Sequence, residues 1–459
     1  MATPTDTQAV WAELMIDALA STGVRHVVLS PGSRSTPLVL ALVAEPRIVL
    51  HDVVDERSAA FVALGIARAT GAPAALVCTS GSAVAHYHPA VAEAAASSLP
   101  LVVLSANRPF AFQRAGESQT IDQTKLFGDA VRFFADLGEP SPRAFDLRAM
   151  RRIVAQAVSF ARGPHPGPVH LDARFVKPLE PPLVPDAAHA ALASEIRGRG
   201  GPTIHPPRST ASDVALDALA SALARSERPI VVVGPRRSAD LGAGLAELAG
   251  RFGVPVFVDP TSNHRFGAAA GLYLGATDAI FRSAGFLAES APDLVLQIGR
   301  APVASGYAKL CTEKAPILIA IDAQDYLDPW SLATQVVLGD PEDALTRLAM
   351  RLRESDVSLD AAWSSRLRAI DAFAFDEAAR LARRGEISEG GIARALVDAL
   401  PEGGRLVLGN SLAVRQVDDY VPPNEKRIEV LSQRGASGID GLVAGLVGAQ
   451  LAAPTRVLS

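Results

Sequence analysis

The sequence has 459 residues, 49% of them hydrophobic and 20% charged, with a formal net charge of −5. This globular composition supplies cores for about three domains, and it gives no electrostatic basis for binding nucleic acid or an anionic membrane. The two cysteines, Cys78 and Cys311, lie far apart without a CxxC partner. This argues against a disulfide framework or a structural zinc site, and it fits a reducing cytoplasm.

The first region alternates short runs of Val, Ile and Leu with Ala-rich helical segments, as in a parallel sheet covered on both faces by helices. Its opening residues, up to Gly23, form an acidic amphipathic pattern without a basic leader, which predicts a helix and not a signal peptide. Because no run of 18 apolar residues occurs, we expect no membrane insertion. Strands are expected at "HVVLS" (26–30), "RIVLHDV" (47–53), "AALVCT" (74–79), "PLVVLSA" (100–106) and "GPVHLDA" (167–173).

A proline-dense stretch over 178–207 predicts a crossing linker, and a second α/β unit follows it. Helical, charged sequence from about 340 to 384 then leads into a third region, with a helix at "SEGGIARALVDAL" and a strand at "RLVLGNS". Strands of the second unit are expected at 229–235, 254–259, 293–299 and 317–322. The expected domains cover 1–180, 213–345 and 346–459, with a linker at 181–212.

The first and third regions share an order of elements: strand, Gly/Ser/Arg turn, helix, strand, polar turn, Gly/Ala helix and strand. Residues 59–77 align without a gap on 440–458 and give four identities, the proline included. Ala-rich helices often match by chance, so this likeness is weak evidence of a duplication. In the first copy the last strand continues into "CTSGSA", whereas the sequence ends at the matching point of the third region.

Five strand-end loops carry residues suited to chemistry. Four combine Arg with Ser or Gly, namely "SPGSRSTPL", "SANRPFAFQRAGESQTID", "GNSLAVRQVD" and "SQRGASGIDG". The fifth, "VVDERSAAFVALGIA", places Glu56 where a strand turns into an apolar helix. Each alone is more often a capped turn or a first-turn acid. Because ligands bind at the carboxyl ends of parallel strands, and guanidinium groups favour carboxylates and phosphates, the repetition indicates an anion site.

The motifs "SPGSRSTPL", "DERSA", "TSGSA", "SANRP", "GNSLAVR" and "RGASGIDG", in this order, closely resemble the 2-succinyl-5-enolpyruvyl-6-hydroxy-3-cyclohexene-1-carboxylate synthase family. The resemblance implies a thiamine-diphosphate-binding fold of three parallel-sheet α/β domains. These are a pyrimidine-binding domain (1–180), a central Rossmann-like domain (213–345), and linker helices with an incomplete diphosphate-binding domain (346–459). It further implies a carboligase of menaquinone synthesis that decarboxylates 2-oxoglutarate and adds the resulting carbanion to isochorismate.

The resemblance also implies cofactors, partners and residue roles. Thiamine diphosphate and Mg²⁺ (or Mn²⁺) are the expected cofactors, and the active site is expected at the interface of a homodimer or a dimer of dimers. Glu56 matches the acid held against the pyrimidine ring, Ile439 the apolar residue that props the cofactor, and Ser437 a cofactor-binding position. For Ile439, a place in a buried core is the alternative. The positions that match substrate-binding residues are Ser33, Arg34, Arg108, Gln119, Ser411, Arg415 and Arg434.

The sequence departs from the family at the magnesium motif, a Gly-Asp pair followed further along by an Asn. The Gly-Asp pairs here are Gly128-Asp129 and Gly339-Asp340, and neither is followed by an Asn at the family's spacing. No metal ligand is therefore expected in this chain; the family pattern places the motif beyond Ser459. We expect a truncated form of a longer enzyme, with a degenerate gene product as the alternative.

Two other functions stay open on the sequence. A different thiamine enzyme of the acetolactate-synthase type would share Glu56 but would not need four arginines at strand ends. A non-catalytic binding or regulatory protein would keep the substrate and pyrimidine sites without the diphosphate site.

Overall fold

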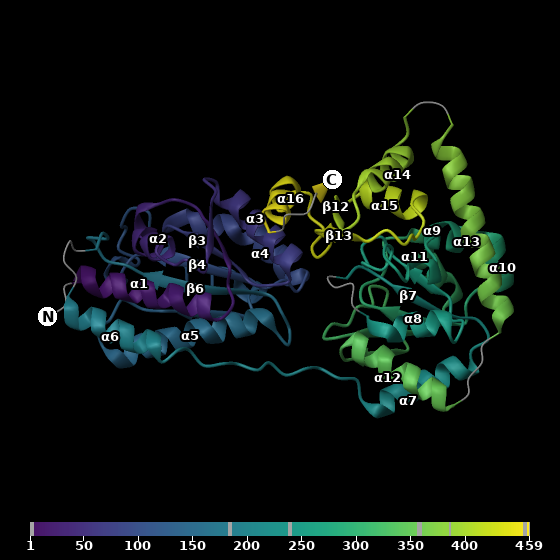
Figure 1. The fold of residues 1–459 in the computed structure, drawn as a ribbon, viewed down its shortest axis with the longest axis horizontal. Helices are drawn as coiled ribbons and strands as arrows, with labels where there is room; N and C mark the ends of the chain where they lie inside the picture. Colours follow the sequence, from purple (N-terminus) through teal and green to yellow (C-terminus); the bar gives the residue numbers. More distant parts are fainter. Residues whose placement is uncertain are drawn as a thin grey trace. The chain divides into compact units, whose positions relative to one another are not determined.

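A computed structural model describes residues 4–181, 186–236, 241–355, 360–384, 387–452 and 457–458. The chain divides into two compact units (Figure 1). Unit 1 comprises Met1–Pro207 and Gln433–Pro454, and unit 2 comprises Arg208–Ser432 and Thr455–Ser459. The described residues form three parallel sheets with helices between the strands, which confirms the predicted α/β class. The expected domain boundaries stay predictions.

Unit 1 contains a six-stranded parallel sheet with the strand order β2-β1-β3-β4-β6-β5. Its central strands are buried along their whole length, which explains why they read as continuous apolar runs. The five predicted strands of the first region are confirmed. The bounds are β1 (His26–Leu29), β2 (Val49–Asp52), β3 (Ala74–Cys78), β4 (Leu101–Asn107), β5 (Phe133–Asp136) and β6 (Pro168–Arg174).

Each face of this sheet has its own hydrophobic core. In β3, Ala75 and Val77 pack with residues of α1, α2, α5 and α6, whereas Ala74, Leu76 and Cys78 pack with residues of α3 and α4. The alternation follows from the period of two along a strand. The helices are α1 (Pro4–Ser21), α2 (Thr36–Val43), α3 (Glu56–Thr70), α4 (His88–Ala96), α5 (Ala144–Arg162) and α6 (Ala187–Gly198).

Helix α16 (Leu442–Leu451), which comes after the whole of unit 2 in sequence, packs directly on α3 (Figure 1). A Cβ atom built on Gly65 of α3 would lie 2.0 Å from the carbonyl oxygen of Gly445, and one on Gly448 would lie 2.0 Å from the carbonyl oxygen of Val62. The glycines therefore allow the two helix backbones to approach more closely than any side chain would permit.

Unit 2 contains a five-stranded parallel sheet with the order β11-β10-β9-β7-β8. The four predicted strands of this region are confirmed, as is the helical stretch that follows them. The strands are β7 (Pro229–Val233), β8 (Val256–Val258), β9 (Leu294–Ile298), β10 (Ile317–Asp322) and β11 (Gln335–Leu338). The helices are α7 (Asp213–Arg225), α8 (Gly242–Gly250), α9 (Thr277–Arg282), α10 (Ala284–Ser290), α11 (Ser305–Lys309), α12 (Pro341–Glu354) and α13 (Ala361–Ala382).

The third sheet has three strands in the order β13-β12-β14, all parallel. It belongs to a strand–helix–strand–helix–strand series, in which the second strand lies on one side of the first and the third on the other. The first sheet begins with the same series and the same arrangement, β2-β1-β3. The elements are α14 (Glu389–Ala399), β12 (Gly404–Leu408), α15 (Leu412–Tyr420), β13 (Ile428–Ser432), α16, which joins unit 1, and β14 (Val457–Leu458). The likeness expected between the first and third regions therefore extends to topology.

The structure differs from the sequence-based expectation at three elements. Helix α6 lies inside the stretch expected to be a linker, where the described residues 181, 186 and 199–212 lie outside helices and strands. Strands β5 and β11 were not predicted, and both lie at sheet edges. Edge strands are partly exposed, so their sequences lack the continuous apolar run of the central strands.

Candidate functional site

The first cluster of predicted site residues lies at the carboxyl ends of β1, β3 and β4. These strands are parallel neighbours, so the segments that follow them meet at one edge of the sheet. A Cβ atom at Gly32 would lie 2.3 Å from the Cβ of Thr79. The glycine therefore allows the segment after β1 to pass close to the segment after β3. The sheet thus brings Ser33 and Arg34, which follow β1, near the loops after β3 and β4.

Arg34 is buried, with a relative exposure of 4%. Its backbone N–H donates to Oγ1 of Thr79 at 3.2 Å, and its Nη1 donates to the carbonyl oxygen of Phe175 at 2.8 Å. Burial lowers the pKa of Arg34, the charge of Arg108 lowers it further, and the carboxylate of Glu117 raises it. Among the described residues Arg34 forms no ion pair, so its charge is not neutralised by a direct contact.

Arg108 follows β4, and its Nη1 lies 3.4 Å from Oε1 of Glu117. The backbone of Arg108 is held by Arg174, whose Nη1 donates to the carbonyl oxygen of Arg108 at 2.8 Å. Arg174 is itself buried, paired with Asp136 at 2.6 Å and stacked under the ring of Phe110 at 3.9 Å. Sequence reasoning missed this supporting residue, although an Arg that ends a fully buried strand is a signal for it.

Gln119 contacts the loop after β3 through Ser80. Its side-chain amide donates to the carbonyl oxygen of Ser80 at 3.1 Å, and the hydroxyl of Ser80 donates to the carbonyl oxygen of Gln119 at 3.1 Å. Gly81 makes this possible, since a Cβ atom there would lie 2.8 Å from Cγ of Gln119. The Nε of Arg108 points at the same carbonyl oxygen of Gln119, at 3.4 Å. Ser33, Arg34, Arg108 and Gln119 therefore share one edge of the sheet.

Glu56 is the first residue of α3 and is half-buried. The preceding residue, Asp55, caps the helix by accepting a hydrogen bond from the backbone N–H of Ser58 at 2.8 Å, and hydrogen bonds from Ser58 lower the pKa of Asp55. Because Asp55 takes the capping role, the carboxyl of Glu56 is left for another partner. The residues from Ala59 to Ala67 are buried behind it.

The loop from Arg434 to Asp440, which precedes α16, is anchored in unit 1 by Glu93 of α4. The carboxylate of Glu93 accepts hydrogen bonds from the backbone N–H groups of Gly435 (2.9 Å), Ala436 (2.7 Å) and Ser437 (3.3 Å). Ile439 is 78% exposed, which rules out the alternative of a core position for this residue. Ser437 is also exposed, and Arg434 is half-buried.

Ser411 and Arg415 belong to unit 2 and lie together there. Ser411 precedes α15 with a positive φ of 70°, and its carbonyl oxygen accepts a hydrogen bond from Nη1 of Arg415 at 3.3 Å. Both side chains are exposed at the start of this helix. The N-terminus of α15 follows the carboxyl end of β12, the position that favours anions in α/β folds.

The described residues contain no group of three or more His, Cys, Asp or Glu that could hold a metal ion. Asp340 of one Gly-Asp pair instead caps α12 by accepting a hydrogen bond from the backbone N–H of Glu342 at 3.0 Å.

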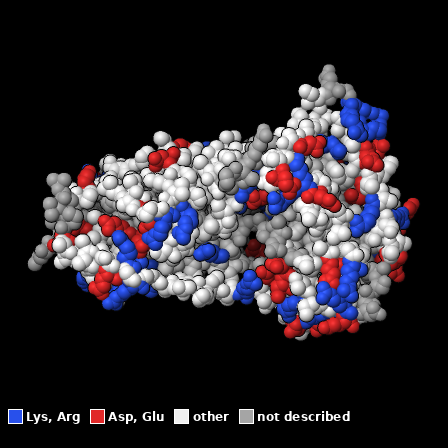
Figure 2. All heavy atoms as spheres, viewed as in Figure 1, with Lys and Arg blue, Asp and Glu red and all other residues white. Residues whose placement is uncertain are grey.

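Among the residues that the structure describes, no helix has the length and apolar character to cross a membrane. Figure 2 shows basic and acidic side chains interspersed over the face in view.

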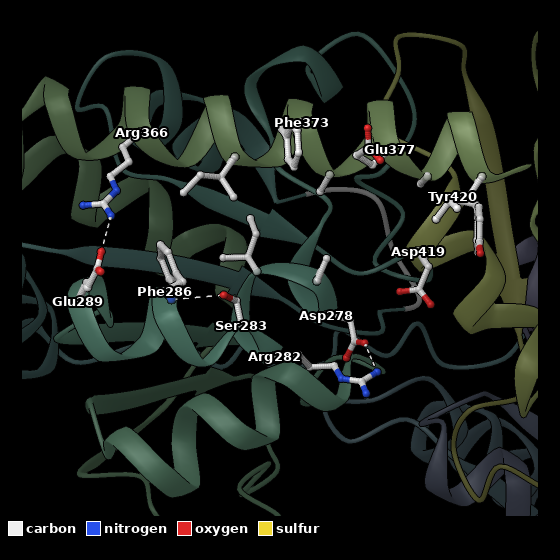
Figure 3. A pocket seen from close by; sticks show the side chains of 16 residues that line it. Asp278, Arg282, Ser283, Phe286, Glu289, Arg366, Phe373, Glu377, Asp419 and Tyr420 are labelled. Atoms are coloured by element: carbon white, nitrogen blue, oxygen red, sulfur yellow. Dashed lines mark hydrogen bonds and ion pairs between the residues drawn. The ribbon is translucent and has the colours of Figure 1, made fainter.

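A separate cavity of about 740 Å³ lies in unit 2, between α9, α10, α13 and α15 (Figure 3). Phe286 and Phe373 are among its lining residues, and its two arginines are paired with acids of the same cavity. Arg366 lies 3.7 Å from Glu289, and Arg282 lies 3.3 Å from Asp278. None of the predicted site residues lines this cavity.

Comparisons with known proteins agree with the motifs. Residues 10–126 match the family described as "Thiamine pyrophosphate enzyme, N-terminal TPP binding domain". A 2-succinyl-5-enolpyruvyl-6-hydroxy-3-cyclohexene-1-carboxylate synthase of Sorangium cellulosum is 43% identical over 98% of this chain and 75% of its own length. Proteins of the same name are 38% identical in Geobacillus kaustophilus (99% of this chain, 78% of theirs) and 38% in Halorubrum lacusprofundi (96% and 75%).

Proposed function

Because the chain belongs to the 2-succinyl-5-enolpyruvyl-6-hydroxy-3-cyclohexene-1-carboxylate synthase family, we propose that it is a thiamine-diphosphate-dependent carboligase of menaquinone biosynthesis. Its substrates in this proposal are 2-oxoglutarate, which loses carbon dioxide, and isochorismate, which receives the remaining succinyl unit. The observation that carries the proposal is the pair Arg34 and Arg108 at one sheet edge, with the charge of Arg34 not neutralised by any ion pair among the described residues.

The proposed substrates explain why arginine is used in these loops. Each substrate carries two carboxylates, and a guanidinium presents paired N–H groups that match the two oxygens of a carboxylate. We assign Ser33, Arg34, Arg108 and Gln119 to substrate carboxylates and hydroxyls at the unit 1 edge. Three further residues, Ser411, Arg415 and Arg434, are assigned to substrate on the same chemical ground.

Thiamine diphosphate, when bound, supplies a ring carbanion that attacks carbonyl carbon, with its own aminopyrimidine as the base. Glu56 suits the pyrimidine ring because it is half-buried at a helix N-terminus and is released from capping by Asp55. Its role is to hold a proton at the ring nitrogen. Ile439 and Ser437 are assigned to the same cofactor, since the exposed isoleucine offers an apolar support. Mg²⁺, or Mn²⁺ in its place, stays a proposed cofactor, and no step is assigned to it.

We further propose a homodimer or a dimer of dimers in the cytoplasm. Helix α16 carries Val443, Val447 and Leu451 at 78%, 43% and 45% exposure, and their spacing places them on one side of the helix. Such an exposed apolar stripe suits a protein interface. Cys78 and Cys311 are free and buried, as in proteins of a reducing compartment. Light scattering of the purified protein measures the oligomeric state.

The test of the function is direct. The protein is incubated with thiamine diphosphate, magnesium, isochorismate and either 2-oxoglutarate or pyruvate, and release of carbon dioxide is measured with loss of isochorismate. Turnover with 2-oxoglutarate supports the proposal. Turnover with pyruvate instead supports an acetolactate-synthase-type enzyme. The absence of turnover, together with no calorimetric signal for thiamine diphosphate and magnesium, supports a non-catalytic role and contradicts the proposal for this chain.

A further inference from the structure

Glu93 is a buried carboxylate that has no place among the residues assigned above. It lies in the Ala-rich helix α4, and its relative exposure is 3%. A buried charge is costly unless it is paired and fully hydrogen-bonded, so its partners reveal what it does.

All the hydrogen-bond partners of Glu93 among the described residues are donors. Besides the three backbone N–H groups of Gly435, Ala436 and Ser437, Oε1 accepts from the hydroxyl of Ser97 at 2.7 Å and from Nη2 of Arg68 at 3.0 Å. Arg68 supplies the opposite charge from α3, and Ser97 follows α4 directly. Three successive N–H groups aimed at one anion form a concave backbone site of the kind that proteins use for anions.

The loop conformation is adapted to this carboxylate. Ser437 has a positive φ of 61°, and a Cβ atom at Gly435 would lie 2.4 Å from Oγ of Ser97. A residue larger than glycine would therefore push the loop away from Glu93. The same short loop carries Arg434, Ser437 and Ile439, the three residues assigned to substrate and cofactor.

We propose that Glu93 is a positioning residue: its carboxylate fixes the Arg434–Asp440 loop in the conformation from which Arg434 and Ile439 bind their ligands. This inference rests on the proposed function for the identity of the ligands. Glu93 itself acts through the backbone of the loop. Binding of substrate by Arg434 therefore depends on Glu93, although Glu93 contacts the loop backbone, Ser97 and Arg68 and not the substrate.

The test uses Glu93→Gln, which keeps the shape of the side chain but leaves one acceptor oxygen. The amide nitrogen must then face a donor, so either Gly435 or the pair Ala436 and Ser437 loses its acceptor. We expect amide hydrogen exchange at residues 435–437 to become at least about tenfold faster, and the KM for 2-oxoglutarate to rise by about tenfold while kcat changes less. Glu93→Asp, which keeps both oxygens, should restore part of each property.

The matched control is Glu247→Gln, which neutralises an Arg-paired glutamate of unit 2 and should leave exchange at 435–437 and the KM unchanged. Wild-type exchange rates at 435–437 in folded Glu93→Gln would overturn the proposal, as would faster exchange with an unchanged KM. If Glu93→Gln does not fold, Glu93→Asp is measured in the same way. A wild-type protein without carboligase activity contradicts the proposed function alone, and exchange at 435–437 then decides whether Glu93 holds the loop.

Discussion

Arg34 and Arg174 are two buried guanidinium groups near the carboxyl ends of parallel strands, and their surroundings give them different roles. Arg174 is paired with Asp136 at 2.6 Å and lies against the ring of Phe110, so its charge is satisfied within the protein. Arg34 has one contact to a carbonyl oxygen and no ion pair among the described residues. A buried guanidinium without a counter-charge gains a strong charge-assisted interaction when an anion binds beside it. Arg34 is therefore the better candidate for binding an anionic ligand.

Arg34→Met tests this difference. Loss of a charge-assisted hydrogen bond is worth about 1.5–3 kcal/mol, so the KM for at least one of the two substrates should rise by about 10-fold or more. The measurement is a pair of steady-state titrations. Arg25→Met is the control, because Arg25 also donates to backbone carbonyls but precedes β1, at the opposite end of the strand. Unchanged apparent affinity for both substrates would remove Arg34 from the anion site.

Glu56→Gln should lower kcat by at least about 100-fold, the usual loss when a proton-transfer group is removed. The thermal midpoint should stay close to that of the wild type, because Asp55 caps the helix and Glu56 does not. Asp55→Asn is the control, since asparagine caps a helix nearly as well as aspartate. Activity retained in Glu56→Gln would show that the pyrimidine ring is held by another acid.

His170 makes unit 1 sensitive to acid. Burial lowers the pKa of His170 from 6.5 to about 3. Below pH 6.5 the unfolded chain therefore binds a proton that the folded chain does not, so the stability of the folded protein decreases as the pH decreases. Burial raises the pKa of Asp172 from 3.8 to about 6, which has the opposite effect between these values. The charge of Asp136 raises the pKa of His170, against the larger effect of burial.

We therefore expect His170→Gln to remove the loss of stability that sets in below pH 6.5 and to leave the opposite contribution of Asp172. Urea unfolding of both proteins at pH 7.5 and pH 5 measures this. The free energy of unfolding of the variant, relative to the wild type, should increase on going to pH 5. Equal differences at the two pH values would mean that His170 is protonated in the folded protein.

At the scale of elements, a single arginine joins three parts of unit 2. Arg265 is completely buried and donates to the carbonyl oxygens of Val258, Gly275, Asp418 and Val421 at 2.7–3.0 Å. The last two belong to the end of α15 and the residue after it, where a cation also stabilises the helix dipole. Ser411 and Arg415 lie at the other end of this helix, so their placement depends on Arg265.

Arg265→Met should destabilise unit 2 by about 3–5 kcal/mol, because it leaves buried carbonyl groups without donors and Asp418 without its partner. Denaturant unfolding followed by circular dichroism measures the change. Arg225→Met, an exposed arginine of α7, should stay within about 0.5 kcal/mol of the wild type. A small change for Arg265→Met would mean that water replaces the guanidinium.

The elements that could be predicted from the sequence are those whose environment is uniform. Central strands such as β3 and β4 are buried on both faces, so their apolar runs are unmistakable. β5 and β11 are half-exposed edge strands, and α6 lies among prolines that indicate a linker.

The same reasoning applies to the candidate site. Arg34 and Glu56 follow strands and could be found from their turns. Glu93 lies in the middle of a helix, and three of its five partners are backbone N–H groups more than 340 positions away, so no local pattern indicates its role.

At the scale of the whole molecule, unit 1 is discontinuous: its last helix, α16, is reached only through unit 2. The contact between α3 and α16 depends on Gly65, where any side chain would meet the carbonyl oxygen of Gly445. The connection at 201–208 is exposed and free of helix or strand, so it can be cut without disturbing either core.

A specific protease site placed between Gly200 and Gly201 should therefore give two fragments that elute together in size-exclusion chromatography. Introduction of Gly65→Val should separate them, because the valine displaces α16. Gly198→Val is the control, since a Cβ atom there meets nothing within 4 Å. Fragments that stay together with Gly65→Val would show that the α3–α16 contact is not what joins them.

The discontinuity of unit 1 also has a consequence for protein synthesis. The ribosome completes α3 early, but α16 emerges only after all of unit 2 has been translated, a delay of roughly 20–75 s at about 5–20 residues per second. During that time the face of α3 around Phe61 and Gly65 has no covering helix, and Glu93 has none of its three backbone donors. The nascent chain thus presents an apolar surface beside a carboxylate that has only Arg68 and Ser97 as partners, so we expect ribosome-associated chaperones to bind this face until α16 arrives.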